Sequence, residues 1–259
     1  MTEFLQAFSM QSRVVHAFIL RETRTRFGKT RLGYLWALFE PMAYILTMVG
    51  IFAALGRGAP IDVDITLFFF SGILPFLMFS KMLTGLSTAI DANQQLLTYP
   101  QVKTLDIMVA RLILEFSTLF VVGVFYLAVT YLLGTFKGVE QVAATIGGLM
   151  MAAMLGAAMG LLGGIAKLYM PAYSNFQGVL SRVLFFTSGI FFVAEGLPKA
   201  LQEWLWYNPV LHLTEWVRSS FFYGFESGFY DLSYPAICIL FLLFMGLSAE
   251  RVSRHKLRV

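Results

Sequence analysis

Long runs of apolar residues, separated by short polar stretches, dominate the chain. A helix needs about 20 apolar residues to cross the hydrocarbon of a bilayer, because each residue advances it by only about 1.5 Å. Six segments meet this requirement roughly. The pattern therefore predicts an all-α polytopic membrane protein with six transmembrane helices, at residues 34–55, 65–88, 107–133, 142–166, 176–194 and 232–249.

Composition agrees with this interpretation. Hydrophobic residues make up 58% of the 259 residues, and charged residues make up only 13%. A soluble domain of this length needs a far more polar surface. The single cysteine, Cys238, lies in an apolar run, so the sequence excludes an internal disulfide and indicates no thiol site.

Basic residues indicate how the predicted helices are oriented. Five cations lie between residues 21 and 31, directly before the first predicted span. Lys and Arg that flank a membrane helix stay on the cytoplasmic side, because moving them across the bilayer is costly. Six spans place both termini on one side, and most of the 19 Lys and Arg residues then fall on that side. We therefore expect both termini in the cytoplasm.

Residues 1–33 form a cytoplasmic segment that precedes the six-span domain of residues 34–259. Within this segment, residues 2–27 are predicted to form a helix whose apolar and basic residues gather on different sides. Such a helix is typical of a segment that lies in the headgroup plane of a bilayer. A flexible basic tail is the alternative. The apolar residues include Val14, Val15, Phe18 and Ile19, and the basic residues are Arg13, Arg21 and Arg24.

Gly28, Lys29 and Thr30 match the end of a phosphate-binding loop. The complete motif also requires a glycine five positions before Gly28, where this chain has Thr23. We interpret the stretch as a solvated basic turn and not as a nucleotide site.

Lys81 lies inside the second predicted span. A cation within a membrane is a functional hypothesis by default, here a role in lining a channel. Its long side chain could instead snorkel to the headgroups, and both interpretations remain open. In the third span, Arg111 and Glu115 have the i, i+4 spacing of a helical ion pair.

A polar stretch at residues 91–103 separates the second and third spans on the cytoplasmic side. It is long enough for a short helix that ends before Pro100. The stretch suits a docking surface for a separate cytoplasmic protein, and a solvated loop is the alternative. Its candidate contact residues are Asp91, Asn93, Gln94, Gln95, Tyr99, Pro100 and Lys103.

The fourth span carries small residues at strict four-residue spacing. Such a stripe allows another helix to approach closely, and close packing is what associates helices in lipid. The pattern indicates assembly and does not distinguish a partner helix of the same chain from one of a second copy. The stripe consists of Gly148, Ala152, Gly156, Gly160 and Gly164.

Between the fifth and sixth spans, residues 195–231 contain two short mixed stretches, at 197–207 and 210–225, broken by Asn208 and Pro209. Each is too short or too polar to cross the membrane. Their aromatic residues suit a bilayer interface, so we expect paired re-entrant helices, with an ordinary loop as the alternative. The aromatic residues are Trp204, Trp206, Tyr207 and Trp216.

The sequence contains few groups that could carry catalysis. The three histidines lie far apart, and no cluster of His, Cys and carboxylate residues has metal-ligand spacing. There is no nucleophile elbow and no chain of buried acidic residues for proton relay. These observations disfavour a membrane enzyme and a proton-driven carrier, and no cofactor is expected in this chain.

Four features of the chain carry a resemblance to a known class. They are the block from Arg21 to Pro41, the six spans, the polar loop after the second span and the Trp-Tyr-Asn-Pro sequence before the last span. The chain resembles the permease subunits of type-2 ABC exporters. It is most similar to the capsular polysaccharide exporters and is also similar to O-antigen and teichoic acid export permeases. The stretch from Leu32 to Pro41 is the most specific part of the match.

The resemblance implies a bacterial inner-membrane protein in which two copies form a channel. Two copies of a cytoplasmic ABC ATPase would bind ATP and Mg²⁺ and dock on residues 91–103. A lipid-linked polysaccharide would be the substrate, a periplasmic adaptor and an outer-membrane pore would be further partners, and no nucleic acid would be involved. The candidate entrance or channel residues are Arg24, Arg26, Lys29, Arg31, Leu32, Gly33, Tyr34, Trp36 and Lys81. The candidate exit residues are Trp204, Trp206, Tyr207, Asn208, Pro209 and Trp216.

The expected function is therefore that of a channel-forming subunit without its own ATPase. The nearest alternative is a permease of the same class for O-antigen, teichoic acid, a lipid or a drug. A secondary carrier, a membrane-embedded glycosyltransferase and a structural scaffold are alternatives from other classes.

Overall fold

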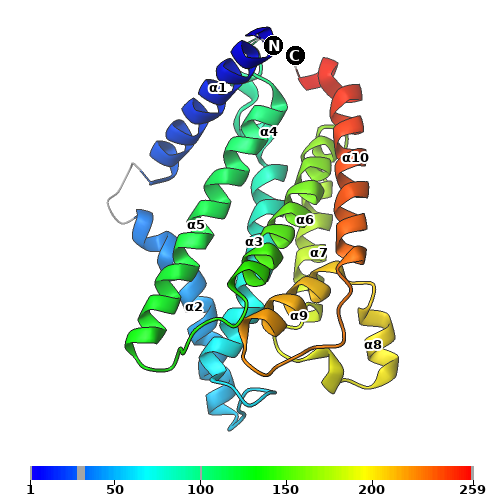
Figure 1. Cartoon of the computed structure of the whole chain (residues 1–259). Coiled ribbons are helices and arrows are strands. Elements are labelled where there is room, and N and C mark those ends of the chain that lie inside the picture. The colour runs from blue at the N-terminus through cyan, green and yellow to red at the C-terminus, as the bar shows by residue number, and fades with distance from the viewer. Residues whose placement is uncertain (1, 28–32, 100, 258–259) are drawn as a thin grey trace.

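The computed structural model describes residues 2–27, 33–99 and 101–257, and most of this part of the chain is helical (Figure 1). No strand occurs among these residues. The predicted all-α class is confirmed. The long helices are α1 (Thr2–Phe27), α2 (Gly33–Ala54), α3 (Ile65–Ser87), α5 (Thr104–Leu132), α6 (Val142–Tyr169), α7 (Tyr173–Thr187) and α10 (Ser233–Leu257).

Short helices connect the long ones at two places. Between α3 and α5 lie α4 (Ala89–Ala92) and the 3₁₀ turn η1 (Gln94–Leu96). Between α7 and α10 lie the 3₁₀ turn η2 (Ala194–Gly196), α8 (Lys199–Leu205) and α9 (Pro209–Phe221). The expected pair of short helices on either side of Asn208 is therefore present as α8 and α9.

The long helices run alongside one another as a bundle, and both chain termini lie at the same end of it (Figure 1). We call this the terminal end. The short helices α8 and α9 lie at the opposite end (Figure 1). Helix α1 lies beside the part of α5 that is nearest the terminal end, and Phe18 of α1 is buried there.

Helices α3 and α6 form the centre of the bundle. Almost the whole length of α3 is buried, including Phe68, Phe79 and Leu83, which are completely inaccessible. By contrast, α5 and α10 expose apolar side chains such as Val121 and Phe241, each 61% exposed. An apolar outer face around a buried centre is suited to lipid surroundings.

Four of the described helices are long and apolar enough to cross a membrane: α3, α5, α6 and the Ser233–Arg254 part of α10. The apolar helical segment Leu38–Ala54 of α2 is shorter than these four helices. Helix α7 has 15 residues, or roughly 22 Å of helix, against a hydrocarbon core of about 30 Å. The predicted fifth span is therefore wrong at its end, because the helix ends at Thr187 and not at residue 194.

Local backbone geometry explains where α7 ends. Gly189 has a φ of +73°, a left-handed conformation that glycine adopts without steric cost. The side-chain amide of Asn208 donates to the carbonyl oxygen of Thr187 at 3.1 Å and to Oγ of Ser188 at 3.2 Å. A residue at the start of a later helix thus provides hydrogen bonds to the end of α7. The apolar pattern along the sequence does not reveal this contact.

The small-residue stripe of α6 faces α3 and α9 of the same chain. A Cβ atom on Gly156 would lie 2.1 Å from the carbonyl oxygen of Phe79. Cβ atoms on Gly160 and Gly164 would lie 2.9 and 3.3 Å from carbonyl oxygens of α3, and one on Gly148 would lie 2.5 Å from a valine methyl of α9. The helix backbones approach this closely because side chains are absent. The partner of the stripe is intramolecular.

Candidate functional site

At the terminal end, α1 is fastened to the region around α4 and α5 by three polar contacts. The Gln11 amide donates to the carboxylate of Asp106. Arg21 donates to Oδ1 of Asn93 at 2.6 Å, and Arg111 Nη2 lies 2.6 Å from Glu22 Oε1. Asn93 lies in the polar stretch at 91–103, and Asp106 and Arg111 lie in the first turns of α5.

Asn93 and Arg111 extend these contacts to further elements. The buried Asn93 amide also donates to the carbonyl oxygen of Ala89 in α4, at 2.9 Å. Arg111 Nη1 donates to the carbonyl oxygen of Gly85 near the end of α3, at 2.8 Å, and to Thr88 Oγ1 at 3.3 Å. Arg111 thus links α1, α3 and α5 at the end of the bundle where the polar stretch lies.

A cavity of about 410 Å³ opens between α1, α3 and α5. Lys81 lies in its wall, and its ammonium group is 2.6 Å from Glu40 Oε1 of α2. Both side chains are about one-third exposed, so this ion pair contributes at most about 1 kcal/mol to stability. The cavity combines opposite charges with three hydroxyl groups and is suited to hydrogen bonding. Its lining is Glu22, Thr25, Lys81, Thr84, Gly85, Thr88, Arg111 and Glu115.

The polar stretch at 91–103 presents most of its candidate docking side chains to the outside. Tyr99 is 61% exposed, and Leu97 is buried beneath the stretch. Asn93 differs, since its side chain is 6% exposed and bonded to Arg21. Pro100 lies outside the described residues. The exposed members are Asp91, Gln94, Gln95, Tyr99 and Lys103.

The candidate entrance residues are only partly described. Arg24 is exposed on α1, and Trp36 is 66% exposed on α2, with its ring 5.6 Å from that of Phe39. The structure does not bring Arg24 or Trp36 into the cavity that contains Lys81. Outside the described residues or side chains lie Arg26, Lys29, Arg31, Leu32, Gly33 and Tyr34.

At the opposite end, Asn208 and Pro209 begin α9. Asn208 Oδ1 accepts a hydrogen bond from the amide of Val210 at 3.0 Å, which caps the helix. Pro209 occupies the first turn, where its missing amide hydrogen has no cost. Asn208 also donates hydrogen bonds to the end of α7, so the Asn-Pro pair both begins α9 and fixes it against α7.

A fully buried ion pair lies within α9, and sequence reasoning missed it. Arg218 Nη1 is 3.2 Å from Glu215 Oε1, and both side chains have no solvent exposure. Arg218 also donates to the carbonyl oxygens of Gly189 at 2.6 Å and Phe192 at 3.2 Å, and its guanidinium carbon lies 4.4 Å from the centre of the Phe68 ring. The i, i+3 spacing of the two charges in an otherwise mixed segment was the available signal.

The same pair organises the loop between α7 and α8. Glu215 Oε1 accepts a hydrogen bond from the amide of Ala194 at 3.1 Å, while Arg218 binds two carbonyl groups of the loop. Charges buried in a low-dielectric environment are tolerated only when they are paired and hydrogen-bonded. The pair therefore holds the loop against α9.

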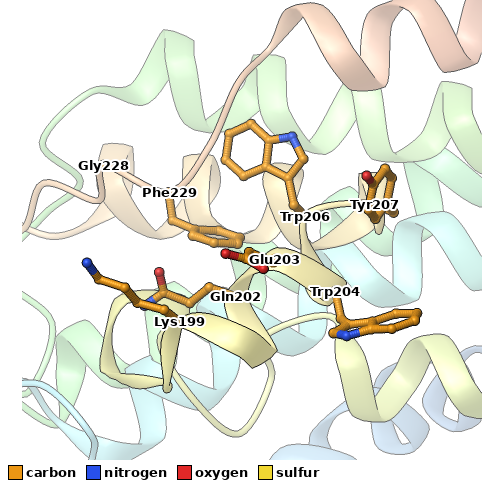
Figure 2. Close-up of a pocket in the computed structure, with 8 residues that line it drawn as sticks. All are labelled: Lys199, Gln202, Glu203, Trp204, Trp206, Tyr207, Gly228 and Phe229. Atoms are coloured by element: carbon orange, nitrogen blue, oxygen red, sulfur yellow. The ribbon is translucent and has the colours of Figure 1, made fainter.

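A groove of about 830 Å³ lies along α8 (Figure 2). Trp204 and Tyr207 are 80% and 73% exposed, and Trp206 lies beside Phe229 in Figure 2. Trp216 is not part of this groove, because its ring packs near Gly147 and Gly148 of α6. The groove lining is Lys199, Gln202, Glu203, Trp204, Trp206, Tyr207, Gly228 and Phe229.

His212 supports the wall of this groove from inside. Its Nε2 lies 2.8 Å from the carbonyl oxygen of Trp206, and its Nδ1 accepts a hydrogen bond from the amide of Asp231 at 3.0 Å. Nδ1 is therefore unprotonated, and Nε2 carries the proton that it donates to Trp206. Burial lowers the pKa of His212, while the contacts with Trp206 and Asp231 act in the other direction.

No group of three metal-ligating side chains occurs among the residues that the structure describes. The arrangement instead offers a hydrogen-bonding cavity at the terminal end and an aromatic groove at the opposite end.

Comparison with known proteins identifies the family. Residues 13–222 match the family model of the ABC-2 type transporter. The chain is 32% identical over 244 residues to the polysialic acid transport protein KpsM of Escherichia coli, covering 94% of this chain and 95% of that protein. It is 27% identical to the capsule polysaccharide export inner-membrane protein BexB of Haemophilus influenzae, and 26% identical to CtrC, described in the same words, of Neisseria meningitidis. Each of these two matches covers 95% of this chain and 93% of the relative. The chain belongs to the ABC-2 type transporter membrane family.

Proposed function

We propose that this chain is the channel-forming permease subunit of an ATP-driven exporter that moves lipid-linked capsular polysaccharide across the bacterial inner membrane. The observation that carries the proposal is the similarity, over almost the whole length, to proteins named for polysialic acid transport and capsule polysaccharide export. Four described helices that are long and apolar enough to cross a membrane, both termini at one end and polar sites at both ends support it.

In the proposed topology, α2, α3, α5, α6, α7 and α10 cross the membrane, and the termini are cytoplasmic. Helices α8 and α9 enter from the periplasmic face and turn back. Irregular backbone at membrane depth requires hydrogen-bond partners within the protein. Glu215 and Arg218 of α9 provide such partners for the loop between α7 and α8, which supports this placement of α9. Helix α1 lies in the cytoplasmic headgroup plane, where its exposed Arg13 and Arg24 face anionic lipid.

Two copies of this chain are proposed to form the channel, and two copies of a separate ABC ATPase bind ATP and Mg²⁺. The ATPase docks on the exposed residues of the 91–103 stretch, among them Tyr99 and Lys103. Movement of this stretch reaches α1 through Asn93, and Arg111 of α5 links α1 to the end of α3. A periplasmic adaptor and an outer-membrane pore complete the proposed path.

The cavity with Lys81 is proposed as part of the cytoplasmic entrance. Its threonine hydroxyls and charged groups present donors and acceptors to a hydroxyl-rich substrate, and the pairing of Lys81 with Glu40 prevents one strong cationic contact from retaining an anionic polymer. Weak, distributed contacts suit a chain that has to slide.

The deciding experiment is purification of this chain from its native membrane, followed by an ATPase assay with and without capsular glycolipid. We expect an ABC ATPase to co-purify and the glycolipid to stimulate it. Reversing the charge of Asp91 to Lys should reduce ATPase co-purification, whereas Lys137→Glu, an exposed charge reversal beyond α5, should not. Absence of any ATPase would contradict the exporter class, and stimulation only by a drug or a free lipid would contradict the proposed substrate.

A further inference from the structure

The groove along α8 has the chemistry of a saccharide-binding surface. Sugar rings present apolar C–H groups on their faces and hydroxyl groups around their edges. They are therefore bound by flat aromatic rings flanked by carboxylate, amide and amine groups. We propose that this groove binds pyranose units of the exported polymer, an inference that rests on the proposed function and adds a contact site on the exit side.

The three polar side chains of the groove and Trp206 come from one helical face. Lys199, Gln202, Glu203 and Trp206 follow the i, i+3, i+4, i+7 spacing along α8 and the turn that continues it. An amine, an amide and a carboxylate therefore lie in a row beside an indole ring. Figure 2 shows Lys199, Gln202 and Glu203 on the same side as Trp206 and Phe229.

The aromatic wall is fixed in place without a ligand. The Trp206 ring packs edge-on against His212 and Phe229, with centroid distances of 4.6 and 5.3 Å. The Gln202 amide donates to the carbonyl oxygens of Leu197 at 2.9 Å and Glu195 at 3.2 Å. Side chains that are ordered beforehand lose little entropy when a ligand binds, so even shallow contacts yield measurable affinity.

Trp204 and Tyr207 extend the aromatic surface toward solvent. Both are exposed by more than 70%, whereas Leu205 of α8 packs against the buried cluster of Ala194, Leu211 and Phe229. A band of aromatic residues at a membrane interface also exposes Trp and Tyr. Such a band needs no row of amine, amide and carboxylate groups within the same groove, and this row favours saccharide over lipid.

The charges in the groove predict weak and general binding. Lys199 and Glu203 have opposite signs and lie one helical turn apart, so the groove carries little net charge. A pyranose is then held by stacking and single hydrogen bonds and not by ionic attraction. This is the contact that allows a long polymer to pass over the surface.

The test measures saccharide binding by the full chain in lipid nanodiscs, using equilibrium dialysis with two radiolabelled probes. These are a neutral α-linked glucose hexasaccharide and an anionic sialic acid hexasaccharide. We expect millimolar binding of at least one probe. Trp204→Leu and Tyr207→Leu should each weaken it by about 2- to 10-fold, the range given by the loss of one aromatic contact. Both side chains are too exposed for their loss to unfold the protein.

The matched control is Tyr131→Leu, which removes an aromatic residue that is 66% exposed at the end of α5, also at the opposite end of the bundle (Figure 1). This variant should bind both probes like the wild type. The proposal is overturned if neither hexasaccharide binds, or if the control variant weakens binding as much as Trp204→Leu does. It is also overturned if the α8 variants change only the binding of phospholipid vesicles, because the aromatic residues then act as a membrane anchor.

A parallel assay separates this inference from the proposed function. Glycolipid-stimulated ATPase activity of the wild-type complex tests the exporter. If that stimulation is present while Trp204→Leu leaves hexasaccharide binding unchanged, the groove proposal fails and the exporter proposal stands. If no ATPase is found and binding still depends on Trp204, the exporter proposal fails and the saccharide site stands.

Discussion

Glu22 of α1 and Arg111 of α5 form an ion pair across two helices, with 2.6 Å between Oε1 and Nη2. Their side chains are only 15% and 18% exposed, so the pair is partly shielded from solvent. Arg111 simultaneously holds the end of α3 through the carbonyl oxygen of Gly85. The ion pair therefore connects α1 with two helices of the bundle, and does so beside the stretch proposed to receive the ATPase.

Glu22→Lys should release α1 from α5. The substitution places two cations together, and the expected loss lies between the ~1 kcal/mol of exposed pairs and the roughly 3–5 kcal/mol of a broken buried pair. Hydrogen exchange of the α1 amides between residues 9 and 25 should become faster. Arg24→Glu, an exposed charge reversal on the same helix, should leave exchange unchanged. Equal protection in Glu22→Lys and wild type would show that the other contacts of α1, its apolar face and the bonds of Gln11 and Arg21, hold it without this ion pair.

Gly156→Ala should destabilise the subunit itself. The new methyl group would lie 2.1 Å from the Phe79 carbonyl oxygen, so α3 and α6 would have to separate, at a cost of about 1–3 kcal/mol or more. Thermal unfolding in detergent measures this loss. Gly50→Ala is the control, because nothing lies within 4 Å of that position and alanine favours the helix. A Gly156→Ala protein of normal stability that fails only to dimerise would place the stripe between subunits.

Arg218→Met should be more harmful than the double variant Arg218→Met, Glu215→Leu. The single change leaves a carboxylate buried without its cation, which typically costs about 3–5 kcal/mol, whereas replacing both charges by apolar groups is often much milder. Denaturant unfolding of the three proteins measures the difference. Hydrogen exchange of residues 188–196 should rise in the single variant, because that loop loses its anchor. A double variant as unstable as the single one would indicate that the carbonyl contacts of Arg218 dominate.

The positions of the helices could be predicted because apolar runs and their polar breaks are local. The bounds of the N-terminal helix at 2–27 are confirmed, and the Asn208-Pro209 break follows from capping by Asn and the missing amide hydrogen of Pro. The end of α7 could not be predicted, because the partner that caps it, Asn208, comes from a later helix.

The polar contacts of the candidate site were harder to predict for the same reason. Sequence spacing suggested Glu115 of the same helix as a partner of Arg111, but it could not reveal Glu22, which reaches Arg111 from α1. Asn93 was expected on a docking surface, yet its side chain points inward to Arg21. Periodicity along one helix identifies a face, but the residue opposite that face depends on how the helices pack.

Acidification should loosen the groove along α8 through His212. This residue lies in the first turn of α9, a 13-residue helix, and burial lowers its pKa from 6.5. His212 of the unfolded chain therefore binds a proton near pH 6.5, whereas His212 of the folded chain binds one only at lower pH. The stabilisation associated with neutral His212 is complete above pH 6.5 and is lost as the pH falls toward the lowered folded pKa.

Protonation of Nδ1 would also break its hydrogen bond with the Asp231 amide. Hydrogen exchange of residues 228–231 should accelerate between pH 7 and pH 5, after correction for intrinsic rates. In His212→Gln this added pH dependence should disappear, and an equal pH dependence in both proteins would assign it to another group.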